Sequence, residues 1–391
     1  MKKVLITGGS HAEVPLIQAL KEKGYYVIST GNNLDGAGHK LADKYVPGDF
    51  SDCQFVCDLA RKENIDGMVS GCNDFAYLST AYACEELGIC GHDTFRNAQL
   101  VHNKNKFMFA CKKLGIVVPK TYEVSWIEAA ILAAEIIKYP VILKPVDLTG
   151  GKGVSVCRDV DELRTAYERA SELTRSRQLI VEEYVVGENH GGSFLVKNNK
   201  VIFSFFDNEQ YYLNKYLVSG ACYPSNVSED CKRFLIEEIE RFFDAHHLAD
   251  GLFHFQFIIN QKGIPVIIDP CRRSPGDLYI SLVEYATGVN YAERIVDFEL
   301  GKNSSEAFSV NEKNIARECI MTDGNGTYRG IKVAESIRDR IMSVYPLAAE
   351  GEAISNYHTF KAGIAFLEFD TREEMYDYVD KFHDLVTIER E

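Results

Sequence analysis

The chain has 391 residues, of which 46% are hydrophobic, and a formal net charge of −14 at pH 7. Two or three domains of ordinary size fit this length, and the acidic balance excludes a broad nucleic-acid surface, which needs clustered Lys and Arg, and favours a small-molecule partner. No apolar stretch reaches the roughly 18 residues of a membrane span, and the first residues do not match a signal peptide. The eleven cysteines include no C-x-x-C pair. We therefore expect a reduced, cytoplasmic protein without membrane contact.

Residues 1 to about 95 alternate short apolar strands with helical segments. The expected strands are 4–7, 26–30 and 67–71, and the expected helices are 15–20, 53–63 and 75–87. Such alternation predicts a parallel sheet covered on both faces, with ligands bound at the carboxyl ends of its strands. The polar side chains near these ends that are candidates for a carboxylate pocket are Ser10, His11, Glu13, Asn73 and Asp74. Helix capping explains Ser10 and Asp74 nearly as well.

The rest of the chain changes character. A helix is predicted over 104–114 with its end at Gly115, since glycine favours the conformation that terminates a helix. The elements expected next are a helix over 126–138, strands over 140–145 and 153–157, a helix over 159–173 and a strand over 179–185. Hairpins are predicted over 193–208, turning at Asn198-Asn199, and over 253–270, turning at 261–263. Beyond 310, strands over 315–323 and 363–370 flank a helix over 335–341, and a helix over 372–383 follows.

These patterns predict an α/β N-terminal domain with a parallel sheet, two α+β lobes and a small C-terminal α+β module. The expected boundaries are 1–100, 101–190, 191–309 and 310–391.

Lys144 ends an apolar strand, and a glycine-rich segment follows it. An ammonium group beside a loop whose amides are free to close over an anion is typical of a phosphate site. The loop is too short for the P-loop arrangement. A surface hairpin with a solvated lysine is an equally weighted alternative.

Two later segments carry acids after apolar strands. In 179–188 the strand ends in Glu182 and Glu183, an edge that suits an adenine ring and its ribose, with a solvated hairpin end as the alternative. In 253–277, Gln256 and Asp269 are expected to face each other on paired strands as oxygen ligands for Mg²⁺. The Arg272-Arg273 pair follows and suits a transferring phosphoryl group, although a structural salt-bridge network is the favoured interpretation of that pair taken alone.

In this order, the segments resemble the ATP-grasp superfamily over nearly the whole chain. The similar segments are 6–30, 103–122, 139–154, 179–188 and 253–273. The resemblance implies these ATP-binding residues: Lys104, Lys144, Gly150, Gly151, Lys152, Gly153, Glu182, Glu183, Val185 and Glu188, with Asn189 as the alternative to Glu188 for the ribose. It also implies Mg²⁺ at Gln256 and Asp269, and an acyl phosphate at Arg272 or Arg273. Gln256, Asp269 and Cys271 depart from the acid, glutamate and asparagine that the family usually has there, and Asn103 stands where it often has aspartate.

The resemblance implies an ADP-forming ligase that uses ATP and Mg²⁺ to activate a small carboxylate as an acyl phosphate and couples it to an amine or other nucleophile. Tyr211 and Lys215 are further candidates for the substrate pocket, with a packed surface loop as the alternative, and His254 is a weak one. A homodimer is expected only by analogy. A bicarbonate-using carboxylase of the same superfamily and a nucleotide-binding protein without catalysis stay as alternatives. A dinucleotide-dependent oxidoreductase is disfavoured, because GGSHAEV replaces the G-x-G-x-x-G that it needs.

Overall fold

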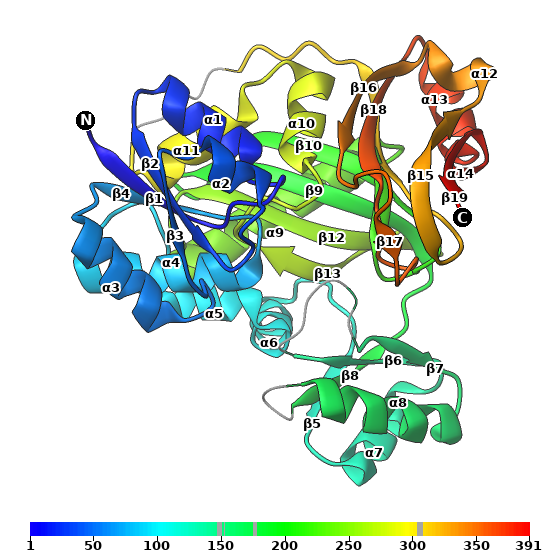
Figure 1. Ribbon diagram of the computed structural model, residues 1–391. Coiled ribbons are helices and arrows are strands. Elements are labelled where there is room, and N and C mark those ends of the chain that lie inside the picture. The colour runs from blue at the N-terminus through cyan, green and yellow to red at the C-terminus, as the bar shows by residue number, and fades with distance from the viewer. Residues whose placement is uncertain (147–150, 152, 175–177, 303–307) are drawn as a thin grey trace.

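The structure is a computed structural model that describes residues 1–146, 151, 153–174, 178–302 and 308–391. Four sheets organise it: two lie in a large body, one lies in a small lobe that projects below the body in Figure 1, and one lies in the C-terminal segment. The N-terminal sheet lies on the left in that view, and the C-terminal segment lies on the right. Within these described ranges, no helix is long and apolar enough to cross a membrane.

The N-terminal sheet is parallel, with strand order β3-β2-β1-β4. Its elements are β1 (Lys3–Thr7), α1 (Val14–Glu22), β2 (Tyr26–Gly31), α2 (Ala37–Leu41), β3 (Lys44–Pro47), α3 (Cys53–Glu63), β4 (Gly67–Ser70) and α4 (Asp74–Leu87). The predicted parallel sheet is therefore confirmed. The sequence reading missed β3, which is a four-residue edge strand with no buried side chain and so carries no apolar pattern.

Two helices connect this sheet to the rest of the body. They are α5 (Phe95–His102) and α6 (Lys104–Leu114). The helix predicted over 104–114 is confirmed with both ends, and Gly115 terminates it at φ 73°, the left-handed conformation that glycine adopts easily. The apolar face of α6 packs against the large sheet and its covering helix, because Phe107 and Phe243 share one core.

The small lobe is an antiparallel sheet, β5-β8-β6-β7, covered by two helices. Its elements are β5 (Thr121–Val124), α7 (Ile127–Ile137), β6 (Val141–Pro145), β7 (Ser155–Cys157), α8 (Val160–Leu173) and β8 (Leu179–Glu183). It has an apolar core of its own, in which alanines of α7 and α8 pack on Val141, Leu143 and Val181. Each predicted element from 126 to 185 is confirmed within a few residues.

The large sheet is antiparallel and eight-stranded, with the order β13-β12-β9-β10-β11-β14-β18-β16. Elements up to residue 299 are β9 (Gly187–Lys197), β10 (Lys200–Tyr211), β11 (Val218–Tyr223), α9 (Glu229–His246), β12 (Gly251–Asn260), β13 (Pro265–Cys271), α10 (Tyr279–Thr287) and α11 (Tyr291–Glu299). Both predicted hairpins are confirmed, and Asn198 and Asn199 turn the first one at φ 51° and 60°.

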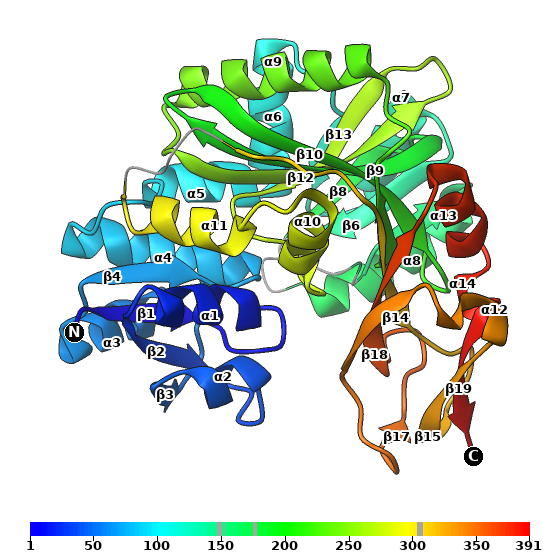
Figure 2. The same ribbon diagram turned by 90° about the horizontal axis from the view of Figure 1, so that it is seen from above.

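Helices cover both faces of the large sheet. In Figure 2, α9 lies on one face, and α10 and α11 lie on the other, between the large sheet and the N-terminal sheet. Leu16 of α1 and Ile295 of α11 belong to the same buried cluster as Leu252 and Phe205 of the large sheet. This shared core fixes the N-terminal strand ends against the large sheet.

The C-terminal segment extends the large sheet. Its elements are β14 (Asn314–Ile320), β15 (Gly326–Val333), α12 (Glu335–Arg338), β16 (Ile341–Pro346), β17 (Ala353–Ile354), β18 (Gly363–Phe369), α13 (Arg372–Val379), α14 (Phe382–Leu385) and β19 (Val386–Arg390). Strands β14, β16 and β18 belong to the eight-stranded sheet, and β17, β15 and β19 form a three-stranded sheet beside it.

Two predictions in this segment were wrong. The helix expected over 335–341 ends at Arg338, and 341–346 form an edge strand instead, since β18 supplies backbone partners and Ile341 and Val344 are β-branched residues that suit a strand. The helix expected over 372–383 ends at Val379, and a separate short helix begins at Phe382.

Candidate functional site

A cavity of about 740 Å³ lies between the small lobe and the β12–β13 hairpin. Its apolar wall residues from the two sides are Ile142, Val154 and Val156 of the lobe and Ile258 and Ile268 of the hairpin. Its polar lining includes Lys104, Lys144, Glu182, Glu183, Asn189, Tyr211, Lys215, Gln256 and Asp269. Apolar walls with a few convergent polar groups are the usual make-up of a small-molecule site.

Lys144 stands on β6 inside the lobe. Its Nζ donates a hydrogen bond of 2.9 Å to Glu182 Oε1 on the neighbouring strand β8. Both side chains are buried, with Lys144 8% and Glu182 2% exposed. The pair is therefore held rigidly at one wall of the cavity.

Lys104 reaches the same cavity from the body. It is the first residue of α6, and its Nζ lies 2.5 Å from Asp269 Oδ1 on β13. Burial opposes the charge of Lys104, but the carboxylate of Asp269, helped by more distant acids, raises the pKa of Lys104 above its ordinary value. Two cations from separate parts of the chain thus meet in one cavity.

The glycine-rich loop is described in part. Gly150 and Lys152 lie outside the described residues, whereas Gly151 and Gly153 have φ angles of 72° and 73°. Gly151 lines the cavity, and a Cβ there would lie 2.8 Å from the Tyr216 carbonyl oxygen. Glycine is required at Gly151 for both the conformation and the close approach.

The segment after β8 forms another edge of the cavity. Glu183 and Val185 line it, and Glu183 Oε2 accepts a hydrogen bond from the Lys120 amide at 3.3 Å. Glu188 is exposed, accepts a hydrogen bond from Asn226 and is outside the lining, whereas Asn189 is part of it. Of the two ribose candidates, Asn189 therefore has the better position.

Gln256 and Asp269 are opposite each other in the β12–β13 register, as the sequence predicts. Gln256 Nε2 donates to both carboxylate oxygens of Glu209 on β10, at 2.8 Å each. Cys271 is buried and its thiol donates to the Arg273 carbonyl oxygen, so it does not replace the missing asparagine as a ligand. Across the described ranges, no three side chains of His, Cys, Asp or Glu gather as a metal site. One carboxylate and one amide oxygen still fit Mg²⁺ that is held together with nucleotide phosphates.

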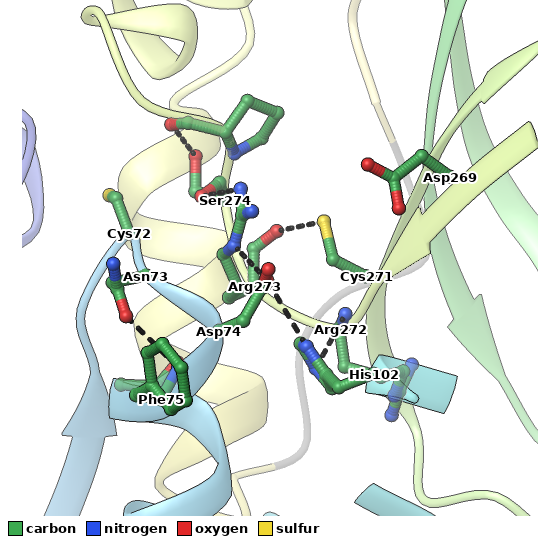
Figure 3. Close-up of polar contacts among 12 residues, drawn as sticks. Cys72, Asn73, Asp74, Phe75, His102, Asp269, Cys271, Arg272, Arg273 and Ser274 are labelled. Atoms are coloured by element: carbon green, nitrogen blue, oxygen red, sulfur yellow. Dashed lines mark hydrogen bonds and ion pairs between the residues drawn. The ribbon is translucent and has the colours of Figure 1, made fainter. Parts of the chain in front are cut away.

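The adjacent arginines diverge (Figure 3). Arg272 is 3% exposed, and its guanidinium donates to Asp93 at 2.7 Å and to the carbonyl oxygens of Leu252 and Ala249. The guanidinium of Arg272 is therefore hydrogen-bonded inside the protein and does not line the cavity. This position argues against the phosphoryl contact expected for Arg272.

Arg273 lies at the junction with the N-terminal sheet. Its Nε donates to Asp74 Oδ1 at 2.8 Å, and the same carboxylate oxygen lies 3.1 Å from His102 Nδ1. Burial opposes the charge of Asp74, but Arg273 and His102 hold the pKa of Asp74 well below its ordinary value. Arg273 is partly exposed, with 18% of its side chain accessible. Like Arg272, it is outside the cavity lining, but its partial exposure makes it the better candidate of the two for an anionic group.

The other strand-end residues have structural partners. Glu13 is buried and accepts hydrogen bonds from the Ser10 amide and hydroxyl and from the Cys72 amide, which ties the β1–α1 turn to the end of β4. Asn73 caps α4 through the Phe75 amide. His11 faces a different part of the chain, because its Nε2 lies 3.7 Å from Asp277 Oδ1 in the loop before α10.

A second polar group lies where the large sheet meets this junction, and the sequence reading missed it. Its members are Asp207, Glu209, Asp277, Tyr279, Arg317 and Lys361. Lys361 Nζ lies 2.5 Å from Asp277 Oδ2, and Arg317 Nη1 donates to the Asp277 carbonyl oxygen at 3.3 Å. These residues come from separate segments and form no motif, so only the fold brings them together.

The cavity and the two sheets beside it define a two-lobed α+β protein whose cavity lies between two antiparallel sheets. Residues 103–217 match the family model described as the ATP binding domain of the carbamoyl-phosphate synthase L chain.

Solved structures resemble the whole chain. One is phosphoribosylglycinamide synthetase from Anaerococcus prevotii, with 22% identity, 100% of each chain covered and a TM-score of 0.78. Another is L-amino acid ligase from Bacillus licheniformis, with 19% identity, 100% of this chain and 99% of the other covered and a TM-score of 0.84. A third is the biotin carboxylase domain of Hydrogenobacter thermophilus 2-oxoglutarate carboxylase, in complex with MgADP, ADP and bicarbonate, with 19% identity, 100% and 91% covered and a TM-score of 0.79. The chain has the ATP-grasp fold, as its motifs predicted.

Proposed function

We propose that this chain is an ADP-forming ligase that binds ATP and Mg²⁺ in the 740 Å³ cavity and activates a small carboxylate as an acyl phosphate. The observation that carries the proposal is the convergence of Lys104 and Lys144 on one apolar-walled cavity. Both lysines belong to the segment that matches an ATP-binding family model. Two ammonium groups facing a cavity offset the negative charge of a triphosphate.

Each part of the cavity then has a task. Lys104, Lys144 and the amides near Gly151 and Gly153 bind phosphates, with Gly150 and Lys152 assigned by resemblance alone. The segment from Glu182 to Val185 contacts adenine, and Asn189 takes the ribose. Asp269 and Gln256 hold Mg²⁺, which when bound neutralises phosphate charge. Arg273 stabilises the acyl phosphate from the side of the N-terminal sheet.

The reaction requires activation because the leaving group of a free carboxylate would be oxide. A carboxylate oxygen attacks the γ-phosphorus, the bond to the β–γ bridging oxygen breaks, and ADP leaves. An amine or other nucleophile then attacks the acyl carbon, and phosphate leaves. Positioning and charge stabilisation are sufficient for both steps, so no covalent enzyme intermediate is required.

A substrate screen tests the proposal. The purified protein is given ATP and Mg²⁺ with amino acids, other small carboxylates or bicarbonate, and ADP is measured. We expect ADP release with at least one carboxylate, and its loss in Lys144→Ala but not in Lys106→Ala, which changes a lysine of α6 that is outside the cavity lining. Formation of AMP and pyrophosphate would contradict the acyl-phosphate mechanism. Bicarbonate as the active acid would favour a carboxylase, and binding of ATP without ADP release would favour a protein without catalysis.

The assembly belongs to the same proposal. One similar structure is described as a dimer of a biotin carboxylase domain. By analogy we propose that this chain forms a homodimer, and sedimentation equilibrium measures the mass of the assembly.

A further inference from the structure

A second cavity, of about 710 Å³, lies where the chain passes from the body into the small lobe. Its walls are α6 of the body, the segment 115–120 and strand β5 of the lobe, and in Figure 1 α6 lies beside the junction of the two parts. All residues that line this entry cavity lie between Asn105 and Glu123. None of them lines the 740 Å³ cavity, so the two cavities are separate spaces.

The entry cavity carries positive charge in an acidic protein. Lys112 and Lys120 line it, and no carboxylate oxygen of a described residue lies within 4.0 Å of either ammonium group. The one acid of the lining is Glu123, whose carboxylate accepts a hydrogen bond from Asn105. The whole chain has a formal net charge of −14, so unpaired cations gathered around a hollow are a local exception.

Two ordinary roles for these lysines leave part of the charge unexplained. A basic residue in the last turn of a helix interacts favourably with the helix dipole, which accounts for Lys112. Lys106 also lines the cavity, but its Nζ donates to Gln99 Oε1 at 3.4 Å. Lys120 precedes β5 and has neither of these roles, so an anion from outside the chain would complete its surroundings.

The rest of the lining is apolar and partly open to solvent. Met108 and Ile116 are buried, whereas two aromatic side chains are exposed, Phe109 to 61% and Tyr122 to 40%. Phe109 belongs to α6 and Tyr122 to β5, so exposed aromatic rings border the hollow on two of its walls. Large exposed apolar side chains around a concave surface are typical of a binding site. An occupant that covers both rings removes apolar area from water.

Strand β5 adds backbone groups to this surface. It is the edge strand of the lobe's sheet and pairs with β8 on one side, and among the described residues no strand pairs with its other side. An unpaired strand edge presents N–H and C=O groups to a neighbouring molecule. Three of the four residues of β5 line the entry cavity, which therefore offers hydrogen-bonding groups beside its cations and aromatic rings.

We propose that the entry cavity is a second ligand site, which binds a small organic anion with an aromatic or acyl body. Lys112 and Lys120 pair with the anionic group, and Phe109 and Tyr122 cover the body of the ligand. The volume of the cavity falls within the roughly 300–1,000 Å³ of small-molecule sites, which favours a small molecule over a protein partner. The ligand contacts α6 and β5 together, so it joins the body to the lobe beside the 740 Å³ cavity.

Fluorescence titration with anilinonaphthalene sulfonate tests the inference without turnover, so its outcome is independent of the ligase function. Phenylnaphthylamine has the same rings without the sulfonate and serves as the neutral probe. We expect the sulfonate to bind at least about tenfold more tightly than the neutral probe. Lys112→Gln combined with Lys120→Gln should weaken sulfonate binding at least about tenfold and leave the neutral probe unaffected, whereas Phe109→Ser should weaken both.

Two matched variants locate the bound probe. Lys262→Gln changes an exposed lysine in the β12–β13 turn, and Leu132→Ser changes an apolar residue of α7 that is 59% exposed. Both residues are outside the lining of the entry cavity, so we expect neither variant to change the affinity for the sulfonate. All of the substituted side chains are exposed, and circular dichroism checks that each variant is folded.

Three results would overturn the inference. The first is equal affinity for the sulfonate and the neutral probe, and the second is sulfonate affinity that Leu132→Ser loses and Phe109→Ser keeps. The third is full sulfonate affinity in the double lysine variant. If ADP and Mg²⁺ also displace the probe in that case, the probe lies in the 740 Å³ cavity instead.

Discussion

The ammonium of Lys104 and the carboxylate of Asp269 lie 2.5 Å apart, although they come from α6 and β13 and are separated by 165 positions in the chain. Each neutralises the charge of the other. The proposed function assigns Lys104 to ATP phosphates and Asp269 to Mg²⁺, so binding of MgATP replaces one ion pair with two charge-assisted contacts.

Loss of the Lys104 ammonium should therefore weaken nucleotide binding. Lys104→Met removes a cation from the phosphate end and leaves Asp269 without a partner, and we expect the affinity for MgATP to fall by about tenfold or more. Calorimetric titration with a non-hydrolysable ATP analogue and Mg²⁺ measures it. Lys106→Met is the control on the same helix and should bind as the unmodified chain does. Unchanged affinity in Lys104→Met would contradict the assignment of this lysine.

The buried pair of Lys144 and Glu182 should stabilise the small lobe only as a pair. Glu182→Gln leaves a buried ammonium without its counter-ion, which costs about 3–5 kcal/mol, and Lys144→Met together with Glu182→Gln should recover much of that loss. Trp126 is the single tryptophan of the chain and is the N-cap residue of the lobe's helix α7, so its fluorescence during urea unfolding reports on the lobe. A double variant as unstable as Glu182→Gln would show that the pair is not the origin of the effect.

Arg272 and Arg273 should separate stability from activity. Arg272→Met breaks a buried ion pair with Asp93 and two bonds to carbonyl oxygens, and we expect a loss of about 3–5 kcal/mol in the free energy of unfolding. Arg273→Met removes a partly exposed side chain, so it should lose less stability but most of the ADP release. Urea unfolding and the ADP assay are run on both variants. Full activity in folded Arg273→Met would exclude Arg273 from the reaction.

Glu299 should make the stability of the protein depend on pH. Burial raises the pKa of this carboxyl from 4.5 to about 7, although the amide and hydroxyl of Ser70 donate to it. Between these values the folded protein keeps a proton that the unfolded chain releases, so the contribution of Glu299 to stability declines as pH rises. The total decline is about 3 kcal/mol at full separation.

Glu299→Gln removes this titration, and its amide can still pair with Ser70. We compare the free energy of unfolding of the variant with that of the unmodified protein at about pH 5 and at about pH 8. The difference in favour of the variant should be larger at the higher pH, by up to about 3 kcal/mol. Urea unfolding at the two pH values measures the gain. Glu335→Gln, at an exposed side chain, should show no such difference. A gain of the opposite sign would mean that Glu299 is ionised in the folded protein at low pH.

Local signals explain which parts of the fold were predictable. Asn198-Asn199 turn a hairpin and Gly115 ends a helix through their own backbone preferences, so no distant partner is needed to predict them. The strand over 341–346 was missed because its partner β18 begins many residues later, at Gly363. The β-branched residues of this segment suit a strand, but the pairing with β18 decides the outcome, and no local pattern reports that pairing.

The site divides in the same way. Lys104, Lys144 and Asp269 belong to segments with recognisable spacing, and the structure brings all three to one cavity. The opposite orientations of Arg272 and Arg273 depend on Asp93 and Asp74, which lie far away in the sequence. Glu209 could not be recognised in the sequence, because its contact with Gln256 forms only when β10 and β12 lie on either side of β9.

The small lobe is one continuous segment of the chain that leaves the body and returns to it. The Glu183 amide donates to the Lys120 carbonyl oxygen at 2.9 Å, so the chain enters and leaves the lobe at adjacent points. A shortened protein that joins Lys120 directly to Tyr184 would keep every ladder of the eight-stranded sheet while losing one wall of the cavity. The lobe is thus a separable part. Comparing ligand binding by the shortened and the full protein would show which ligands need both walls of the cavity and which need only the wall formed by the body.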